Sequence, residues 1–340
     1  MKALVGLAAL VILCAALHLA ARLVLPLVFA MLIMALVWPV HRRLAARLPR
    51  LVAALVALVI ALAVVGALTS MVVWGFGRVG QWAFANAARL QAVYTQVGDW
   101  LEGHGFVLAG VVTEHFNVRW MLRLFQDLSG RLHGLASFLV ITFLYVLLGL
   151  LELDVLGRKL GALGNDTGRF LLDGTRMAAR KLRTYMLVRL MVSLATGAAV
   201  WAFTLASGLE LALAWGAIAF AFNFVPVIGP FAATLLPTLF AIVQFETWQT
   251  ALFIFACLNV IQFVSGSYLE PRFAGAALAV SPLLVLLSVF FFAFLWGLAG
   301  AFIGVPVTIA ILSFCSCHPA TQRIADLLSG RTSPAPAEMR

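Results

Sequence analysis

Ten stretches of this sequence are apolar over nearly the length that a helix needs to cross a lipid bilayer. A spanning helix takes about 20 residues at ~1.5 Å each, and its backbone hydrogen bonds are made within the segment. The sequence therefore predicts an all-α integral membrane protein, a polytopic helical bundle with eight to ten hydrophobic segments, some of them short or re-entrant. The ten stretches lie at residues 4–21, 23–40, 51–76, 133–151, 186–207, 211–225, 229–245, 249–268, 281–297 and 300–316.

The composition supports a membrane protein and argues against a nucleic-acid partner. Hydrophobic residues make up 64% of the chain and charged residues only 11%, whereas soluble domains carry about a quarter charged residues. The formal net charge is +10 at pH 7, but the basic residues stand at the ends of apolar segments. There they set orientation and contact anionic lipid. Membrane lipids, and no nucleic acid, are the partners expected from this pattern.

The polar intervals divide the chain into six regions, two of which are amphipathic helical inserts. In order, the regions are N-terminal transmembrane helices (1–76), an extracytoplasmic amphipathic insert (77–132), a transmembrane helix (133–151), a basic helical linker (152–185), a C-terminal transmembrane block with broken helices (186–316) and a tail (317–340).

The short loop 41–50 sets the predicted orientation. Short loops rich in arginine stay in the cytoplasm, so the N-terminus, the basic linker and the tail are predicted to be cytoplasmic in a bacterial inner membrane. A second apolar run follows the first after Arg22, which favours an uncleaved first helix over a signal peptide. The loop's arginines, expected to lie against lipid headgroups, are Arg42, Arg43, Arg47 and Arg50.

The clearest interruption of an apolar run is Asn223-Phe-Val-Pro226-Val-Ile-Gly229-Pro230. Pro226 and Pro230 lack a backbone donor, and Gly229 permits a tight turn. Broken helices of this kind build substrate or ion sites in transporters. The alternative is a plain turn at the membrane surface, which these ordinary turn residues slightly favour. Segments 211–245 and 281–316 are each either a full hairpin or a re-entrant one.

A second polar cluster follows in the next apolar segment. Asn259, Gln262, Gly266 and Glu270 are spaced three to four residues apart, which predicts a polar ridge along one helix face. Such a ridge suits a bundle interior or a water-filled path. Equally, Glu270 and Arg272 suit a surface ion pair that anchors the helix end. Three other charges are expected in solvent: Arg189 by extending to the cytoplasmic surface, and Glu210 and Glu246 in short loops.

Catalytic and metal-binding signatures are absent from the sequence. It contains no G-x-S-x-G, H-E-x-x-H, phosphate-binding loop or dinucleotide fingerprint. Cys315-Ser-Cys317-His318 has no partner cluster and is weak evidence for a metal site. We therefore expect no enzyme activity, no metal and no cofactor.

Several of these motifs together resemble those of the autoinducer-2 exporter family of bacterial membrane proteins. The specific matches lie within 181–306, and the order of segments agrees over most of the chain. The matching stretches are Asn223–Pro230, the Leu269-Glu-Pro-Arg272 that ends Gln262–Arg272, Ser281-Pro282-Leu, and Trp296-Gly-Leu-Ala-Gly-Ala-Phe-Ile-Gly-Val-Pro306.

The resemblance implies a homo-oligomeric inner-membrane transporter without its own ATPase. Family members are linked to export of autoinducer-2, and others to exchange of Na⁺ or Li⁺ for protons. The family often shows a Gly-Gln pair where this sequence has Val188 and Arg189. A cation at that position disfavours passage of cations and favours a neutral or anionic solute.

Two classes of function are thus predicted. The first is a secondary transporter or exporter of a small solute such as an autoinducer-2-like signal, ion-coupled or not, with a Na⁺(Li⁺)/H⁺ antiporter as its variant. The second is a non-transporting membrane scaffold, in which the polar ridge joins helices. For the transporter, Arg189 is the candidate selectivity residue, and the candidate path residues are Asn223, Pro226, Gly229, Pro230, Asn259, Gln262, Glu270 and Arg272.

Overall fold

A computed structural model describes residues 2–103, 118–162, 166–274 and 280–328 of the chain. These residues are almost entirely helical, which confirms the predicted fold class. The helices are α1 (Lys2–Leu19), α2 (Ala21–Ala45), α3 (Arg50–Ala85), α4 (Ala87–Gly103), α6 (Val118–Ala162), α7 (Asp166–Ala206), α8 (Ala212–Phe222), α9 (Ile228–Phe245), α10 (Trp248–Val264), η1 (Ser265–Leu269), α11 (Glu270–Ala274), α12 (Pro282–Cys317) and α13 (Pro319–Leu328).

Within the described part of the chain, seven helices are long and apolar enough to cross a membrane. Shorter apolar helices, Leu4–Leu19 and Ala212–Phe222, add to them. The 11 residues of α8 extend about 17 Å, roughly half of a ~30 Å hydrocarbon core. This helix therefore cannot cross the bilayer alone.

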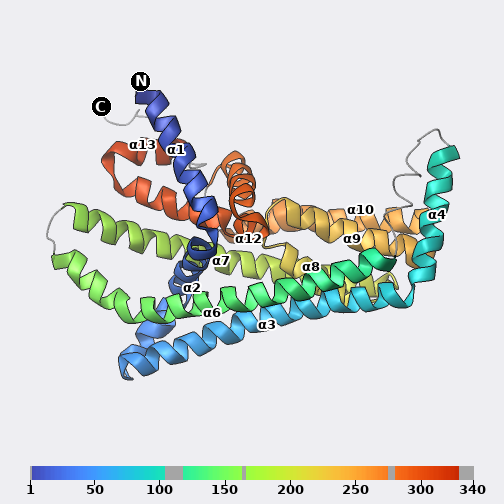
Figure 1. Ribbon diagram of the computed structural model, residues 1–340, viewed down its shortest axis with the longest axis horizontal. Coiled ribbons are helices and arrows are strands. Elements are labelled where there is room, and N and C mark those ends of the chain that lie inside the picture. The colour runs from blue at the N-terminus through green and yellow to red at the C-terminus, as the bar shows by residue number, and fades with distance from the viewer. Residues whose placement is uncertain (1, 104–117, 163–165, 275–279, 329–340) are drawn as a thin grey trace.

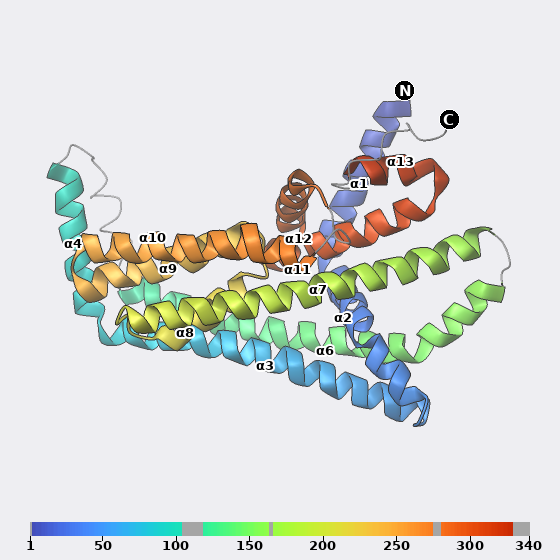
Figure 2. The ribbon, with the colours of Figure 1, turned by 180° about the vertical axis from the view of Figure 1, so that it is seen from behind.

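The longest helices run side by side along most of the molecule. Helices α3 and α6 form one edge, while α4 rises at one end and α1 and α13 lie at the other (Figures 1 and 2). At 36 and 45 residues, α3 and α6 extend about 54 and 68 Å, well beyond the apolar thickness. The predicted insert 77–132 is accordingly built partly from their extensions, together with α4; residues 104–117 of that insert lie outside the described residues.

The junction of α3 and α4 is tied to two loops from the other half of the chain. Trp82 donates its indole N–H to Glu210, and Arg89 forms an ion pair with Glu246 at 3.1 Å. Both acids were expected to be solvated. They remain exposed, but each has a side-chain partner.

Close contact between α7 and α8 depends on a pair of glycines. A Cβ on Gly197 would lie 2.9 Å from the carbonyl oxygen of Gly216, and one on Gly216 would lie 2.8 Å from that of Gly197. Small residues let membrane helices approach at backbone distance. The short helix α8 is thereby packed directly on α7.

Helix α12 is two helical arms joined at a break. Trp296 and Gly297 leave helical geometry, and Gly297 has a φ of +64°, as favoured by glycine. The arms fold back on one another: Gly304 approaches Ser288, and the Thr308 hydroxyl donates to the Ser288 hydroxyl at 2.8 Å. The division of 281–316 into two segments at this point is therefore confirmed.

The bend in α12 is held by α1. The Trp296 indole N–H donates to the Leu17 carbonyl at 3.0 Å, and the His18 Nδ1 lies 2.7 Å from the Leu295 carbonyl oxygen. A helix end in a bilayer needs such partners, because lipid supplies none. The first apolar helix is thus anchored at its C-terminal end.

Candidate functional site

One face of α7 carries a row of buried polar side chains. Tyr185, Arg189, Ser193 and Thr196 are three or four residues apart, so they lie on the same side of the helix. All four are buried. Ionisable and polar groups inside a membrane bundle are costly and mark functional positions by default. This row is the foundation of the candidate site.

The turn between α8 and α9 packs against this row. The Asn223 side-chain amide donates to the Ser193 hydroxyl at 3.0 Å, and Asn223, Val225 and Pro226 are buried. The turn 223–230 is therefore more than a plain surface turn. Val227 and Ile228 are exposed, but Asn223 and Pro226 are buried, and the Asn223 amide bonds to α7.

The backbone of this turn is strained. Val227 has φ +67° and ψ −59°, a γ-turn geometry that is rare for any residue and unfavourable for a β-branched one. The Ile228 N–H donates to the Pro226 carbonyl at 2.8 Å. A Cβ on Gly229 would overlap the carbonyl oxygen of Phe222. Only glycine permits the chain to fold back here, and strain of this kind concentrates at functional sites.

A π-helical turn, η1, interrupts the helix that carries the second polar cluster. The Glu270 N–H donates to the Ser265 carbonyl five residues earlier, which fits one extra residue into the turn. The Ser265 hydroxyl bonds to the Thr196 hydroxyl of α7. Single π-turns are frequent at functional sites, and this one joins α10 to the polar row.

The predicted ridge 259–270 is divided by this geometry. Gln262 and Ser265 are buried, whereas Asn259 and Gly266 are exposed, and the Asn259 amide donates within its own helix to the Phe255 carbonyl at 2.8 Å. The single polar face is therefore not observed. Asn259 lies outside the buried set, and Ser265 takes the place expected for Gly266.

The centre of the site is an ion pair between Arg189 and Glu270, 2.8 Å apart. The Arg189 side chain is only 6% exposed and that of Glu270 is 35% exposed. Arg189 does not extend to the surface as expected, because a carboxylate 81 positions away in sequence holds it inside. The predicted pair of Glu270 with Arg272 is also wrong: Arg272 is exposed and donates to the Tyr268 hydroxyl at 3.0 Å.

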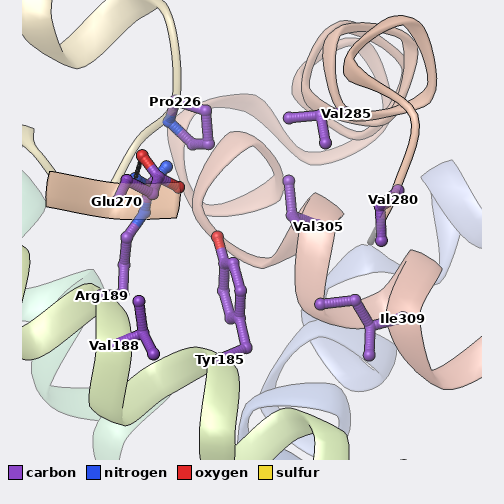
Figure 3. A pocket seen from close by; sticks show the side chains of 9 residues that line it. All are labelled: Tyr185, Val188, Arg189, Pro226, Glu270, Val280, Val285, Val305 and Ile309. Carbon is purple, nitrogen blue, oxygen red and sulfur yellow. Dashed lines mark hydrogen bonds and ion pairs between the residues drawn. The ribbon is translucent and has the colours of Figure 1, made fainter. Parts of the chain in front are cut away.

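A cavity of about 140 Å³ opens beside this ion pair. Figure 3 shows Arg189 reaching toward Glu270, with the Tyr185 hydroxyl pointing into the space below Pro226. The opposite wall is apolar and comes from α12 and from Val280, two residues before it; its α12 residues are Val285, Val305 and Ile309. A hollow of this size, with polar groups on one wall, has room for several waters or a small solute.

Several buried polar atoms of the site have no hydrogen-bond partner in the protein. They are the Tyr185 hydroxyl, the Arg189 Nε and both polar atoms of the Gln262 amide. Buried polar groups are normally paired, so each such group calls for a partner that the chain does not supply. Two of the three residues, Tyr185 and Arg189, line the cavity.

The described residues contain no group of three or more His, Cys, Asp or Glu side chains that could hold a metal ion. The weak indication of a metal site at Cys315, Cys317 and His318 therefore gains no support from these residues.

A sequence model of the AI-2E family transporters matches residues 7–317. The chain belongs to this family. AI-2E proteins are transport proteins, so the prediction that the chain is not an enzyme is confirmed, as is the resemblance drawn from the motifs.

Curated relatives of this AI-2E protein include two bacterial transport proteins. One is "AI-2 transport protein TqsA" of Escherichia coli K12, 35% identical over 145 residues that cover 43% of this chain and 42% of the relative. The other is a "Putative transport protein" of Borreliella burgdorferi, 30% identical over 180 residues that cover 52% and 50%. The matches thus span about half the length of these relatives.

Only some of the predicted site residues of this AI-2E protein lie together at the cavity. Pro226, Arg189 and Glu270 meet at the cavity, Asn223 and Gly229 shape the turn beside it, and Pro230 continues that turn into α9. Asn259 and Arg272 are exposed. Tyr185, Ser193 and Thr196 were missed, although their spacing with Arg189 on one helix face was readable in the sequence.

Proposed function

We propose that this chain is a secondary transporter of the bacterial inner membrane that moves a small neutral or singly anionic solute through the cavity beside Arg189 and Glu270. The observation that carries the proposal is an ion pair between a buried arginine and a half-buried glutamate, facing a cavity where two helices are interrupted. Breaks that line a cavity are the usual construction of transporter sites. A homo-oligomer with a cytoplasmic N-terminus is part of this proposal.

The chemistry of the cavity supports a hydroxyl- or carboxylate-bearing solute. The Tyr185 hydroxyl and the Arg189 Nε–H are donors without protein acceptors, so a solute oxygen would satisfy both. The apolar α12 wall suits the carbon face of the same molecule. Because the relative TqsA is named an AI-2 transport protein, autoinducer-2 is the first candidate to test.

Exchange of Na⁺ or Li⁺ for protons receives less support from the site. A cation would need a free carboxylate, and Glu270 is already neutralised by Arg189 at 2.8 Å. Ion coupling would require Glu270 to exchange this partner during the cycle. A scaffold is also less well supported, since helix-joining polar groups would be dry and mutually bonded, whereas Gln262 and Tyr185 lack partners.

The test is flux in proteoliposomes under an imposed pH gradient, with autoinducer-2, Na⁺ and Li⁺ as separate substrates. We expect flux of autoinducer-2 by the parent and its loss in Glu270→Gln. The matched control is Glu246→Gln, which removes a carboxylate that is exposed and does not line the cavity. Equal flux in both variants, with insertion intact, would remove the ion pair from the mechanism; flux of Na⁺ or Li⁺ alone would favour the antiporter.

A further inference from the structure

A second hollow, of about 390 Å³, lies where the end of α2 meets α7. Its lining is Trp38, Pro39, Arg42, Arg43, Ala46 and Arg183. None of these residues lines the cavity at Glu270, so the hollow is separate from the proposed transport site.

The arginine from α7 bonds in this hollow to a backbone carbonyl that a proline leaves free in α2. Pro39 lies inside α2 and has no N–H, so the carbonyl of Ala35, four residues earlier, loses its helical partner. The Arg183 Nε donates to that carbonyl at 3.2 Å. This bond uses one of the five guanidinium donors and leaves the rest of the group for another partner. Arg183 is half-buried in this position.

The positive charge of the hollow is not neutralised by the protein. Among the residues that the structure describes, no carboxylate forms an ion pair with Arg42, Arg43 or Arg183. Three arginines from two helices line this one hollow, and arginine is the residue that binds phosphate through paired N–H donors.

The position of the hollow points to a lipid as the source of that phosphate. It begins where the apolar run 23–40 ends and the arginine-rich loop 41–50 follows. That junction is the expected depth of the headgroups, and Trp38, half-buried at its edge, is the residue type enriched there. Basic pockets between helices at this level bind anionic headgroups.

We infer that the hollow formed by Trp38, Arg42, Arg43 and Arg183 is a binding site for the phosphate of an anionic phospholipid headgroup. The lipid bridges α2 to α7, the helix that also carries Tyr185 and Arg189. The site would therefore hold the cytoplasmic half of α7 against α2.

The experiment titrates the detergent-purified full chain with phosphatidylglycerol or phosphatidylcholine and reads the first bound lipid by native mass spectrometry. The test variant is Arg42→Gln with Arg43→Gln; the control is Arg47→Gln with Arg50→Gln, which removes the same charge from the same loop outside the hollow. We expect the Kd for phosphatidylglycerol to rise about tenfold or more in the test variant, and less than about threefold in the control. Equal rises in both pairs, or none in either, would overturn the assignment.

Two further arms test the role of Arg183 and the source of the phosphate. Arg183→Lys keeps the charge but not the planar fork, so we expect it to weaken phosphatidylglycerol binding while the melting temperature stays near that of the parent. Inorganic phosphate in large excess is expected to leave the bound lipid in place. If instead it displaces the lipid with the same dependence on Arg42 and Arg43, the site takes soluble phosphate and the lipid assignment is wrong.

Discussion

At the scale of single residues, Arg189 and Glu270 form one ion pair, so the effects of substituting them on stability are best measured together. Glu270→Gln leaves a guanidinium that is 6% exposed without its counter-charge, which we expect to cost about 3 kcal/mol or more. Arg189→Gln leaves a carboxylate that is 35% exposed and is therefore less desolvated, so we expect a smaller cost. Thermal unfolding of both single variants and the double variant measures the coupling. Additive effects would show that the two charges act independently.

A substitution at Gln262 distinguishes a structural role of this residue from a role in transport. Its amide is buried without partners, so Gln262→Met removes an unsatisfied polar group and is expected to raise stability by about 1 kcal/mol. If a solute or water pairs with the amide during transport, flux falls in the same variant. The control is Gln249→Met, an exposed position near the start of α10, measured by the same melting and flux assays. A large loss of stability in Gln262→Met would contradict this account and indicate a hidden structural bond.

Prediction from the sequence failed for residues whose burial depends on a partner far away in the sequence. Nothing local to Arg189 indicates Glu270, so extension to the surface was the reasonable expectation for an arginine near a segment end. Asn259 was assigned to the buried face because a regular 3.6-residue period was assumed. The Tyr185 ring is buried, while its hydroxyl faces the cavity (Figure 3).

At the scale of elements, the turn between α8 and α9 depends on one glycine. A Cβ at position 229 would overlap the Phe222 carbonyl oxygen, and a backbone atom cannot yield as a side chain does. We expect Gly229→Ala to destabilise the protein by about 3 kcal/mol or more. Gly66→Ala in α3 is the matched control, because nothing lies within 4 Å of its Cβ position and alanine favours helix. Equal melting temperatures for the two variants would show that position 229 does not lie against the Phe222 carbonyl in the membrane-embedded protein.

The helix breaks themselves were readable from the sequence. Pro226, Gly229 and Pro230 predicted the interruption of 211–245, and Trp296-Gly297 divided 281–316, because proline and glycine act on the backbone locally. The π-turn at 265–269 was not readable. Its sequence, Ser-Gly-Ser-Tyr-Leu, is compatible with an α-helix. The widened turn is evident from the bond between the Glu270 N–H and the Ser265 carbonyl, and the Ser265 hydroxyl bonds to Thr196.

At the scale of the whole molecule, apolar segments predicted the class of protein but not which segments meet. The site combines α7, the turn 223–227, the η1–α11 junction and both arms of α12, and its lining residues run from Tyr185 to Ile309 in the sequence. Figures 1 and 2 show α7 crossing the centre of the molecule beneath α12. Convergence of these elements on α7 is a property that family membership alone does not reveal.

Transport through this cavity requires that water and small solutes reach it in the membrane. Val188 lines it, while Val192, one turn further along α7, is buried and does not. In a background where Cys14, Cys257, Cys315 and Cys317 are replaced by serine, Val188→Cys and Val192→Cys provide matched single thiols in proteoliposomes.

The decisive measurement is the labelling rate of these two thiols by a membrane-impermeant maleimide, with and without autoinducer-2. We predict that Val188→Cys is labelled and that the solute slows its labelling, whereas Val192→Cys is not labelled. Failure to label Val188→Cys from either side of the membrane, in a folded and inserted protein, would mean that the cavity is closed to water and would contradict a transport path through it.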